Sequence, residues 1–228
     1  MKDSEGFHYV CSKKSKRKEK DCIKWLFSEY EKQTEKLIES SFYCFVSDSI
    51  FKILSLKIDK ISRLVMLGVG SFQNNSRSLT QLCLGIGISK NLGFKGKLQA
   101  YDPVFTFLDC QLLKELNIDF DFEDPSNLYD AKQPVIFYMP HCPISMYETL
   151  FKKNWTLKRL CNIFLIGNCL KTYDLTVEIA KREKYPFVFK ACLIFESVLF
   201  PKTFERPETF NDLAFQWCEG IVAEKFLA

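Results

Sequence analysis

The stretch Leu64-Val65-Met66-Leu67-Gly68-Val69-Gly70-Ser71 is an apolar run that ends in two glycines and a serine, and a helical pattern follows it. A buried strand that turns sharply through glycine into a helix leaves backbone N–H groups bare at the start of the helix, where an anionic group can bind. The stretch therefore predicts a strand, a turn and a candidate binding site. A G-x-G-S turn also occurs as ordinary loop geometry, so that alternative stays open.

Further apolar runs predict more strands, and helix-like spacing of apolar residues predicts helices between them. The strands are expected at about 63–69, 98–103, 118–122, 134–139 and 162–166, with more extended structure at 190–199. Helices are expected within 22–56, from an N-cap at Ser76 to Asn91, at 106–116, and from Pro143 in a first helical turn to Phe151.

These runs are continuously apolar rather than alternating, which is typical of strands buried on both faces. The fold class that this predicts is α/β: a doubly wound, mostly parallel Rossmann-like sheet with helices on both faces, preceded by N-terminal helices. With 228 residues, 47% apolar residues and no Pro/Gly/Ser-rich linker, the chain has material for one large core. We expect a basic flexible tail at 1–20, a helical segment at 21–60 and the α/β domain at 61–228.

The charge pattern bears on partners and location. The net charge of +4 is too small to indicate nucleic-acid binding by the folded body, and the run Lys13-Lys14-Ser15-Lys16-Arg17-Lys18 is either a nuclear-localisation or acidic-partner patch or a solvated terminus. No apolar run reaches the roughly 18 residues that cross a bilayer. We therefore expect a cytoplasmic protein with no membrane span, and the basic run adds the nucleus as a second location.

The ten cysteines are scattered and form no C-x-x-C pair, so the sequence predicts reduced thiols rather than disulfides or a zinc site. No cofactor or metal ion is indicated by residue spacing.

The predicted strands end in polar or turn-forming residues. Because ligands of doubly wound sheets bind beyond the carboxyl ends of the strands, these ends are expected to converge on one cleft. The candidate binding residues are Gly68, Gly70, Ser71, Asp102, Pro140, His141, Gly167 and Asn168.

The blocks L-G-V-G-S, A-Y-D-P-V-F, F-Y-M-P-H-C-P and L-I-G-N, with Phe210-Asn211-Asp212 near the end, resemble the SRR-like domain family, named for plant sensitivity to red light reduced. The resemblance covers about Arg63 to Trp217. It implies a regulatory role in circadian rhythm input, and relatives in animals and fungi imply links to haem-biosynthesis regulation and to microtubules. It implies no catalytic mechanism, so no catalytic residue is assigned.

Each candidate side chain also has a structural interpretation. Asp102 could accept two ribose hydroxyls or cap the following helix, and it lies too far from Gly70 for the dinucleotide fingerprint. His141 could be a general base, a ligand of a metal or haem, or an organiser of its proline-flanked loop. Cys142 could be a soft ligand or a nucleophile, although neighbouring side chains usually point apart. Asn168 could bind a ligand or stabilise a turn.

Three functions stay open on the sequence alone. The first is a non-enzymatic regulatory protein that binds an unidentified protein partner or a small nucleotide-like ligand. The second is a small-molecule transferase of the S-adenosylmethionine type, although the loop after the strand at 134–139 lacks the usual Asn/Asp-Pro-Pro-aromatic signature. The third is a haem or metal sensor that uses His141 and Cys142.

Overall fold

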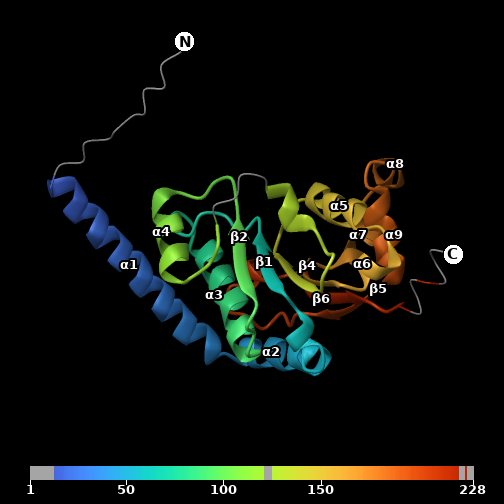
Figure 1. Ribbon diagram of the computed structural model, residues 1–228, viewed down its shortest axis with the longest axis horizontal. Helices are drawn as coiled ribbons and strands as arrows, with labels where there is room; N and C mark the ends of the chain where they lie inside the picture. Colours follow the sequence, from blue (N-terminus) through green and yellow to red (C-terminus); the bar gives the residue numbers. More distant parts are fainter. Residues whose placement is uncertain (1–12, 121–124, 221–223, 225–228) are drawn as a thin grey trace, which may run out of the picture.

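A six-stranded sheet with helices on both faces forms the centre of the molecule, as a computed structural model of residues 13–120, 125–220 and 224 shows (Figure 1). The strand order is β2-β1-β3-β4-β6-β5. The strands are β1 (Arg63–Leu67), β2 (Lys97–Tyr101), β3 (Val135–Met139), β4 (Ile163–Asn168), β5 (Phe195–Leu199) and β6 (Leu213–Cys218). The helices are α1 (Lys13–Ile38), α2 (Ser41–Leu54), α3 (Ser76–Asn91), α4 (Phe107–Glu115), α5 (Ile144–Lys153), α6 (Leu157–Leu160), α7 (Leu170–Thr176), α8 (Ile179–Arg182) and α9 (Pro186–Ile194).

Strands β2, β1, β3 and β4 are adjacent and parallel, which confirms the predicted arrangement. Strand β6 runs antiparallel to β4, and β5 runs antiparallel to β6. The sheet therefore has two antiparallel strands at one side, and the fold still belongs to the mostly parallel α/β class that the sequence predicts. Because the first four strands point the same way, their carboxyl ends lie along one edge of the sheet.

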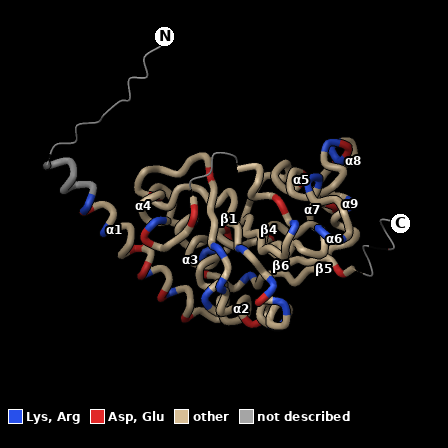
Figure 2. The backbone as a smooth tube through the Cα atoms, in the orientation of Figure 1, with Lys and Arg blue, Asp and Glu red and all other residues tan. Residues whose placement is uncertain are grey.

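The two faces of the sheet have separate apolar cores, because successive strand residues point to opposite faces. Leu64 and Met66 pack with residues of α1, α2, α3 and α4. Val65 and Leu67 pack with residues of α5, α6, α7 and α9. Every residue of β3 is buried, as expected for a strand covered on both faces. Figure 2 shows charged positions along α1, whereas the central strands β4 and β6 carry none.

The N-terminal helices belong to the same core as the sheet. Helix α1 places Leu26, Tyr30 and Leu37 in the apolar cluster that includes Leu64. Residues 13–20, expected to be a flexible tail, form the first turns of α1, because lysine and arginine are good helix formers. Residues 1–12 of the expected tail lie outside the described residues. In the view of Figure 1 the start of α1 extends past α4.

Several predicted elements differ from the structure. The expected strand at 118–122 is a single parallel bridge between Asp119 and Gln99, and 121–124 lie outside the described residues. The extended region at 190–199 divides into the end of α9 and β5, because a short apolar run has no period that separates a buried helix from a strand. Asn75, not Ser76, caps α3, and Pro143 is the cap residue of α5 rather than its first helical residue. Gly167 and Asn168 lie in β4 rather than after it.

None of the helices in the described part of the chain is long and apolar enough to span a membrane. The nine cysteines that the structure describes are free thiols.

Candidate functional site

The glycine turn after β1 approaches two other segments so closely that a side chain would collide with them. Gly68 and Gly70 have φ angles of 65° and 72°, in the left-handed region that favours glycine. A Cβ atom on Gly68 would lie 2.5 Å from Sγ of Cys142, and one on Gly70 would lie 2.6 Å from Oγ of Ser78. Both glycines are therefore required by close packing at this edge of the sheet.

Two carboxylates from the β2–α4 region hold this turn through its backbone N–H groups. Gly70 N donates to Oδ2 of Asp102 at 2.8 Å, and Val104 N donates to Oδ1 of the same carboxylate at 3.0 Å. Asp102 does not cap the following helix, since the N-cap of α4 is Thr106. The helix-cap interpretation of Asp102 is thus wrong, and its carboxylate organises the glycine turn instead.

The second carboxylate is that of Asp109, which sequence reasoning missed. It is fully buried, and its Oδ1 accepts hydrogen bonds from Phe72 N at 2.8 Å and Gln73 N at 2.9 Å. Its Oδ2 accepts from the backbone N–H of Thr106, whose hydroxyl accepts from Asp109 N in return. The Thr-x-x-Asp spacing of this capping box was the available signal. N–H groups that could have bound an exogenous anion are therefore bonded to the chain itself.

Ser71 stands out within this turn. It is buried, and its hydroxyl has no hydrogen-bond partner among the residues that the structure describes. A buried hydroxyl without a partner is unfavourable unless a water or ligand satisfies it.

The loop after β3 turns through His141, which has a φ of 54°. This left-handed conformation is strained for a residue with a Cβ atom. The backbone N–H of His141 donates to Oδ1 of Asn168 at 2.9 Å, and its Nε2 lies 3.0 Å from the carbonyl oxygen of Thr209. A carbonyl oxygen only accepts, so Nε2 carries the proton in this contact. Nδ1 is then the ring atom available as an acceptor or base.

Cys142 points away from His141 and into the sheet. Its Sγ donates to the carbonyl oxygen of Leu67 at 3.2 Å, and burial, with the charge of Asp102 as a smaller cause, raises the pKa of this thiol to about 12. Thiolates are the nucleophiles and metal ligands among cysteines. A thiol with this pKa is protonated at neutral pH, so it is neither a nucleophile nor a metal ligand. Its hydrogen bond joins the His141 loop to the end of β1.

Asn168, at the end of β4, connects the surrounding segments. Its Nδ2 donates to the carbonyl oxygen of Cys142 at 3.0 Å and to the hydroxyl of Tyr173 at 2.8 Å. Its backbone N–H donates to the hydroxyl of Tyr147, and its carbonyl accepts from Nε2 of Gln216. A Cβ atom on the neighbouring Gly167 would lie 2.6 Å from the Tyr147 hydroxyl.

The predicted site residues thus form two contacting groups at one edge of the sheet. Gly70 touches Asp102, and His141, which follows the buried Pro140, touches Asn168. Cys142 connects the groups through its contacts with Leu67 and Gly68. We call this set the carboxyl-edge cluster: Gly68, Gly70, Ser71, Asp102, Pro140, His141, Cys142, Gly167 and Asn168. Whether one ligand touches all of them stays a prediction.

Thr209 was also missed by the sequence analysis. Its carbonyl oxygen accepts from Nε2 of Gln81 at 3.0 Å as well as from His141. Thr209 is 68 residues from His141, and no local pattern marks such a contact.

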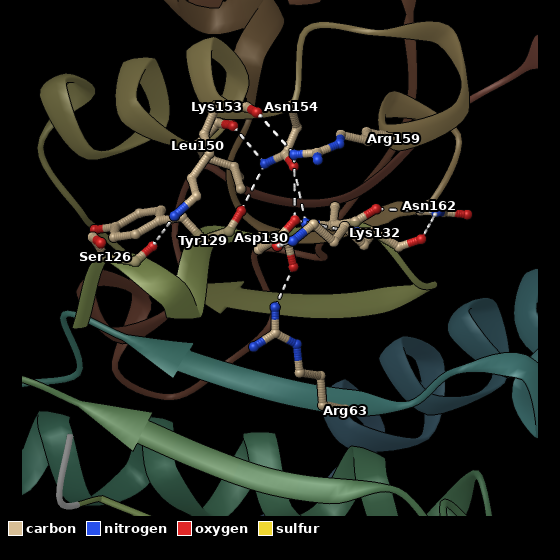
Figure 3. Close-up of polar contacts among 11 residues, drawn as sticks. Arg63, Ser126, Tyr129, Asp130, Lys132, Leu150, Lys153, Asn154, Arg159 and Asn162 are labelled. Atoms are coloured by element: carbon tan, nitrogen blue, oxygen red, sulfur yellow. Dashed lines mark hydrogen bonds and ion pairs between the residues drawn. The ribbon is translucent and has the colours of Figure 1, made fainter. Parts of the chain in front are cut away.

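A second polar network lies at the opposite, amino edge of the sheet (Figure 3). Fully buried Asn154 accepts from Ala131 N and donates to the carbonyl oxygens of Tyr129 and Leu150. Arg63 donates to the carbonyl oxygen of Asp130. The Asp130 carboxylate forms ion pairs with Lys132 at 3.1 Å and Arg159 at 3.3 Å. We call this the amino-edge network, and its bonds fix the segment that leads into β3.

Among the residues that the structure describes, no group of three or more His, Cys, Asp or Glu side chains could hold a metal ion.

Comparison with models of protein families shows to which family the chain belongs. The model of the SRR1 domain matches residues 31–217, which include the carboxyl-edge cluster and the amino-edge network. The chain belongs to the SRR1 domain family. The resemblance seen in the sequence is thereby confirmed, and the match begins within α1, ahead of the sheet.

Curated SRR1 relatives match over about half of the chain. The Arabidopsis thaliana protein SENSITIVITY TO RED LIGHT REDUCED 1 is 28% identical over 113 residues, 49% of this chain and 41% of the relative. The SRR1-like protein of Drosophila melanogaster is 28% identical over 116 residues, 51% of this chain and 42% of the relative. The mouse SRR1-like protein is 28% identical over 130 residues, 55% of this chain and 52% of the relative. The matches thus span about half or less of these relatives' length.

Among solved structures, similar chains include the SAH-bound Podospora anserina methyltransferase PaMTH1, with 11% identity and a TM-score of 0.42 over 94% of this chain and all of that one. The plantazolicin methyltransferase BpumL with SAH has 15% identity and a TM-score of 0.38, over 88% of this chain and 98% of that one. The bound SAH is a property of those two proteins.

Proposed function

We propose that this SRR1-domain chain is a regulatory protein that acts by binding a partner or small ligand at the carboxyl-edge cluster, without a chemical step. The observation that carries the proposal is that polar groups of the cluster are hydrogen-bonded to one another and to neighbouring residues of the chain. The N–H groups of the glycine turn are bonded to Asp102 and Asp109, and Asn168 is bonded to His141 and Tyr173. Such an arrangement fixes a surface shape but leaves no pair of free acid and base groups.

Three further features support binding at this edge. His141 is exposed, and it keeps a strained left-handed conformation. Strain of this kind often collects at functional sites. The buried Ser71 hydroxyl lacks a partner in the described chain, so a ligand that reached it would satisfy it.

Family membership supports a regulatory role, and we propose finer roles by analogy with the relatives. The name of the plant relative is consistent with a part in light responses, and hence in circadian rhythm input. Regulation of haem biosynthesis, a link to microtubules, and a cytoplasmic and nuclear location are further proposals that rest on the resemblance and on the basic run in α1.

The second candidate, a small-molecule transferase of the S-adenosylmethionine type, is favoured by Ser71 and Asp102. Ser71, whose buried hydroxyl has no partner among the described residues, directly follows Gly70, and Gly70 N donates to the Asp102 carboxylate after β2, in the region where nucleotide-binding α/β proteins hold a ribose. The haem or metal sensor is not favoured, because the Cys142 thiol is buried, bonded to Leu67 and protonated at neutral pH.

A thermal-shift screen with S-adenosylmethionine, SAH, NAD, nucleotides and haemin separates these functions. A ligand at a hundred times its Kd stabilises the folded state by about 2.7 kcal/mol. The transferase requires stabilisation by S-adenosylmethionine that is lost in Ser71→Ala, whereas Ser47→Ala, at a buried serine of α2 whose hydroxyl also lacks a partner in the described chain, retains it. Conversion of S-adenosylmethionine to SAH by the wild-type protein would overturn the proposal of a binding protein.

A further inference from the structure

A cavity of about 230 Å³ lies away from the carboxyl-edge cluster, between the α1–α2 corner, the start of α3 and residues 203–206. Its polar lining includes Lys36, Ser40, Thr80, Glu205 and Arg206. Two of these side chains are cations and one is an anion, so the charged lining carries a net positive charge. The cavity is smaller than the roughly 300 Å³ at which pockets for drug-sized ligands begin.

Arg206 is fixed in this lining by neutral groups. Its Nη1 donates to Oγ of Ser76 at 3.1 Å, and its Nη2 donates to Oγ1 of Thr80 at 3.0 Å. Its Nε is buried and has no hydrogen-bond partner within the described chain, and the Glu205 carboxylate, whose pKa the Arg206 charge helps to lower, pairs directly with Lys36. A partly buried guanidinium whose two Nη atoms each carry a second N–H favours an anionic ligand in the cavity, because charge-assisted hydrogen bonds are the strong ones.

Lys36 supplies the second cation. Its Nζ lies 2.8 Å from Oε1 of Glu205, and both side chains are more than half exposed. The Lys36 ammonium lowers the pKa of Glu205 below its usual range. An exposed pair of this kind contributes little to stability, so an incoming anion can displace the carboxylate from Lys36.

The rest of the lining is apolar and aromatic. Phe42 and Phe204 both line the cavity, with ring centroids 5.1 Å apart. Phe42 also stacks on buried Phe210 at 4.8 Å, which holds its ring in place. Helix α2 begins at Ser41, so the positive end of its dipole lies at the same cavity.

We propose that this cavity binds a phosphate monoester carried on a planar ring. Arg206 and Lys36 bind the phosphate, and Phe42 and Phe204 contact the ring. The inference does not depend on the proposed function, because none of these residues belongs to the carboxyl-edge cluster. The ester has two sources, a free nucleoside monophosphate or a phosphotyrosine side chain of a partner protein.

Isothermal titration of the full chain with phenyl phosphate, with phenol as the uncharged control, tests the site. We expect phenyl phosphate to bind and phenol not to bind at the same concentration. Lys36→Gln should weaken binding about tenfold, the size expected for loss of one charge-assisted hydrogen bond. Glu205→Gln should tighten binding severalfold, because it removes the competing carboxylate.

Lys32→Gln is the matched control, since Lys32 forms the same kind of exposed pair, with Glu29 at 2.9 Å, but does not line the cavity. It should leave the affinity unchanged. Arg206→Gln could unfold the chain by breaking its bonds to α3, so the opposite effects of the two exposed substitutions decide the outcome. No binding of phenyl phosphate, or equal weakening by Lys32→Gln and Lys36→Gln, would overturn the inference.

Two further titrations identify the source of the ester. Adenosine 5′-monophosphate and a phosphotyrosine peptide should each show the same dependence on Lys36 and Glu205 if they use this site. The one that binds more tightly shows which class of ester the site prefers, and binding of either that ignores both substitutions would count against the site.

Discussion

The amino-edge network and the carboxyl-edge cluster are both polar, but they differ in backbone conformation. At the amino edge, Asn154 is fully buried and bonds three backbone groups, and the residues drawn in Figure 3 have ordinary backbone angles. At the carboxyl edge, Gly68, Gly70 and His141 take left-handed conformations, and the Ser71 hydroxyl has no hydrogen bond to any residue that the structure describes. The amino-edge network stabilises a loop, whereas the carboxyl edge holds a strained residue and a hydroxyl with no partner among the described residues, as binding sites commonly do.

The largest effect on stability is expected from the amino edge. Asn154→Ala removes three hydrogen bonds, two of them buried, to the backbone groups of Ala131, Tyr129 and Leu150. We expect the free energy of unfolding to fall by about 3 kcal/mol, measured by urea denaturation. Gln133→Ala, at an exposed position on the same segment, should change it by less than about 0.5 kcal/mol. A loss in Asn154→Ala no larger than in this control would show that the network is not structural.

Asp109→Asn should cost about 2 kcal/mol, because a neutral amide replaces a buried carboxylate that accepts from Phe72, Gln73 and Thr106. The glycine turn should loosen as well, so hydrogen exchange of the Gly70 and Phe72 amides should accelerate more than exchange in β3. Glu115→Gln, at an exposed position of the same helix, is the control. Unchanged exchange at the turn would contradict the role assigned to Asp109.

Cys142 gives the carboxyl edge a share in the loss of stability at alkaline pH, to which the buried thiols of Cys83, Cys192 and Cys218 also contribute. Burial raises this pKa from 9.0 to about 12, so ionisation disfavours the folded state. The stability that it contributes is complete below pH 9 and is lost as the pH rises toward 12, with a loss of about 1.4 kcal/mol by pH 10. Cys142→Ala should therefore flatten the fall in stability between pH 9 and 10.5. Cys44→Ala, at an exposed thiol, should leave that slope unchanged.

The smallest effect is expected at His141. Both His141→Ala and His141→Gly remove the contact with Thr209, but glycine relieves the left-handed strain. The glycine variant should be about 1 kcal/mol more stable than the alanine variant, measured by thermal unfolding. Asn117, with a φ of 55° outside both networks, calibrates the measurement, because the same pair of substitutions there should also leave the glycine variant more stable than the alanine variant. Equal stability of the two His141 variants would show that no strain is held there.

The sequence predicted the central strands well because β1, β3 and β4 are continuous apolar runs, and burial on both faces makes that pattern distinctive. It did not predict β6, since Leu213–Cys218 pairs with β4 only through the tertiary fold. Within the site, the positions of Gly70 and Asp102 follow from strand ends. The roles of Asp109 and Thr209 do not, because Asp109 bonds the turn 36 or 37 residues earlier and Thr209 meets His141 from 68 residues away.

The central claim is that the carboxyl edge binds while the amino edge supports the fold. Photo-cross-linking in cells of the source organism tests it most directly, with a photoreactive amino acid at exposed Val104 beside the carboxyl-edge cluster or at exposed Lys132 in the amino-edge network. We expect a discrete adduct from position 104 that disappears in His141→Ala at equal protein abundance, and no such adduct from position 132. The same adduct from both positions, or one from position 132 alone, would contradict the claim.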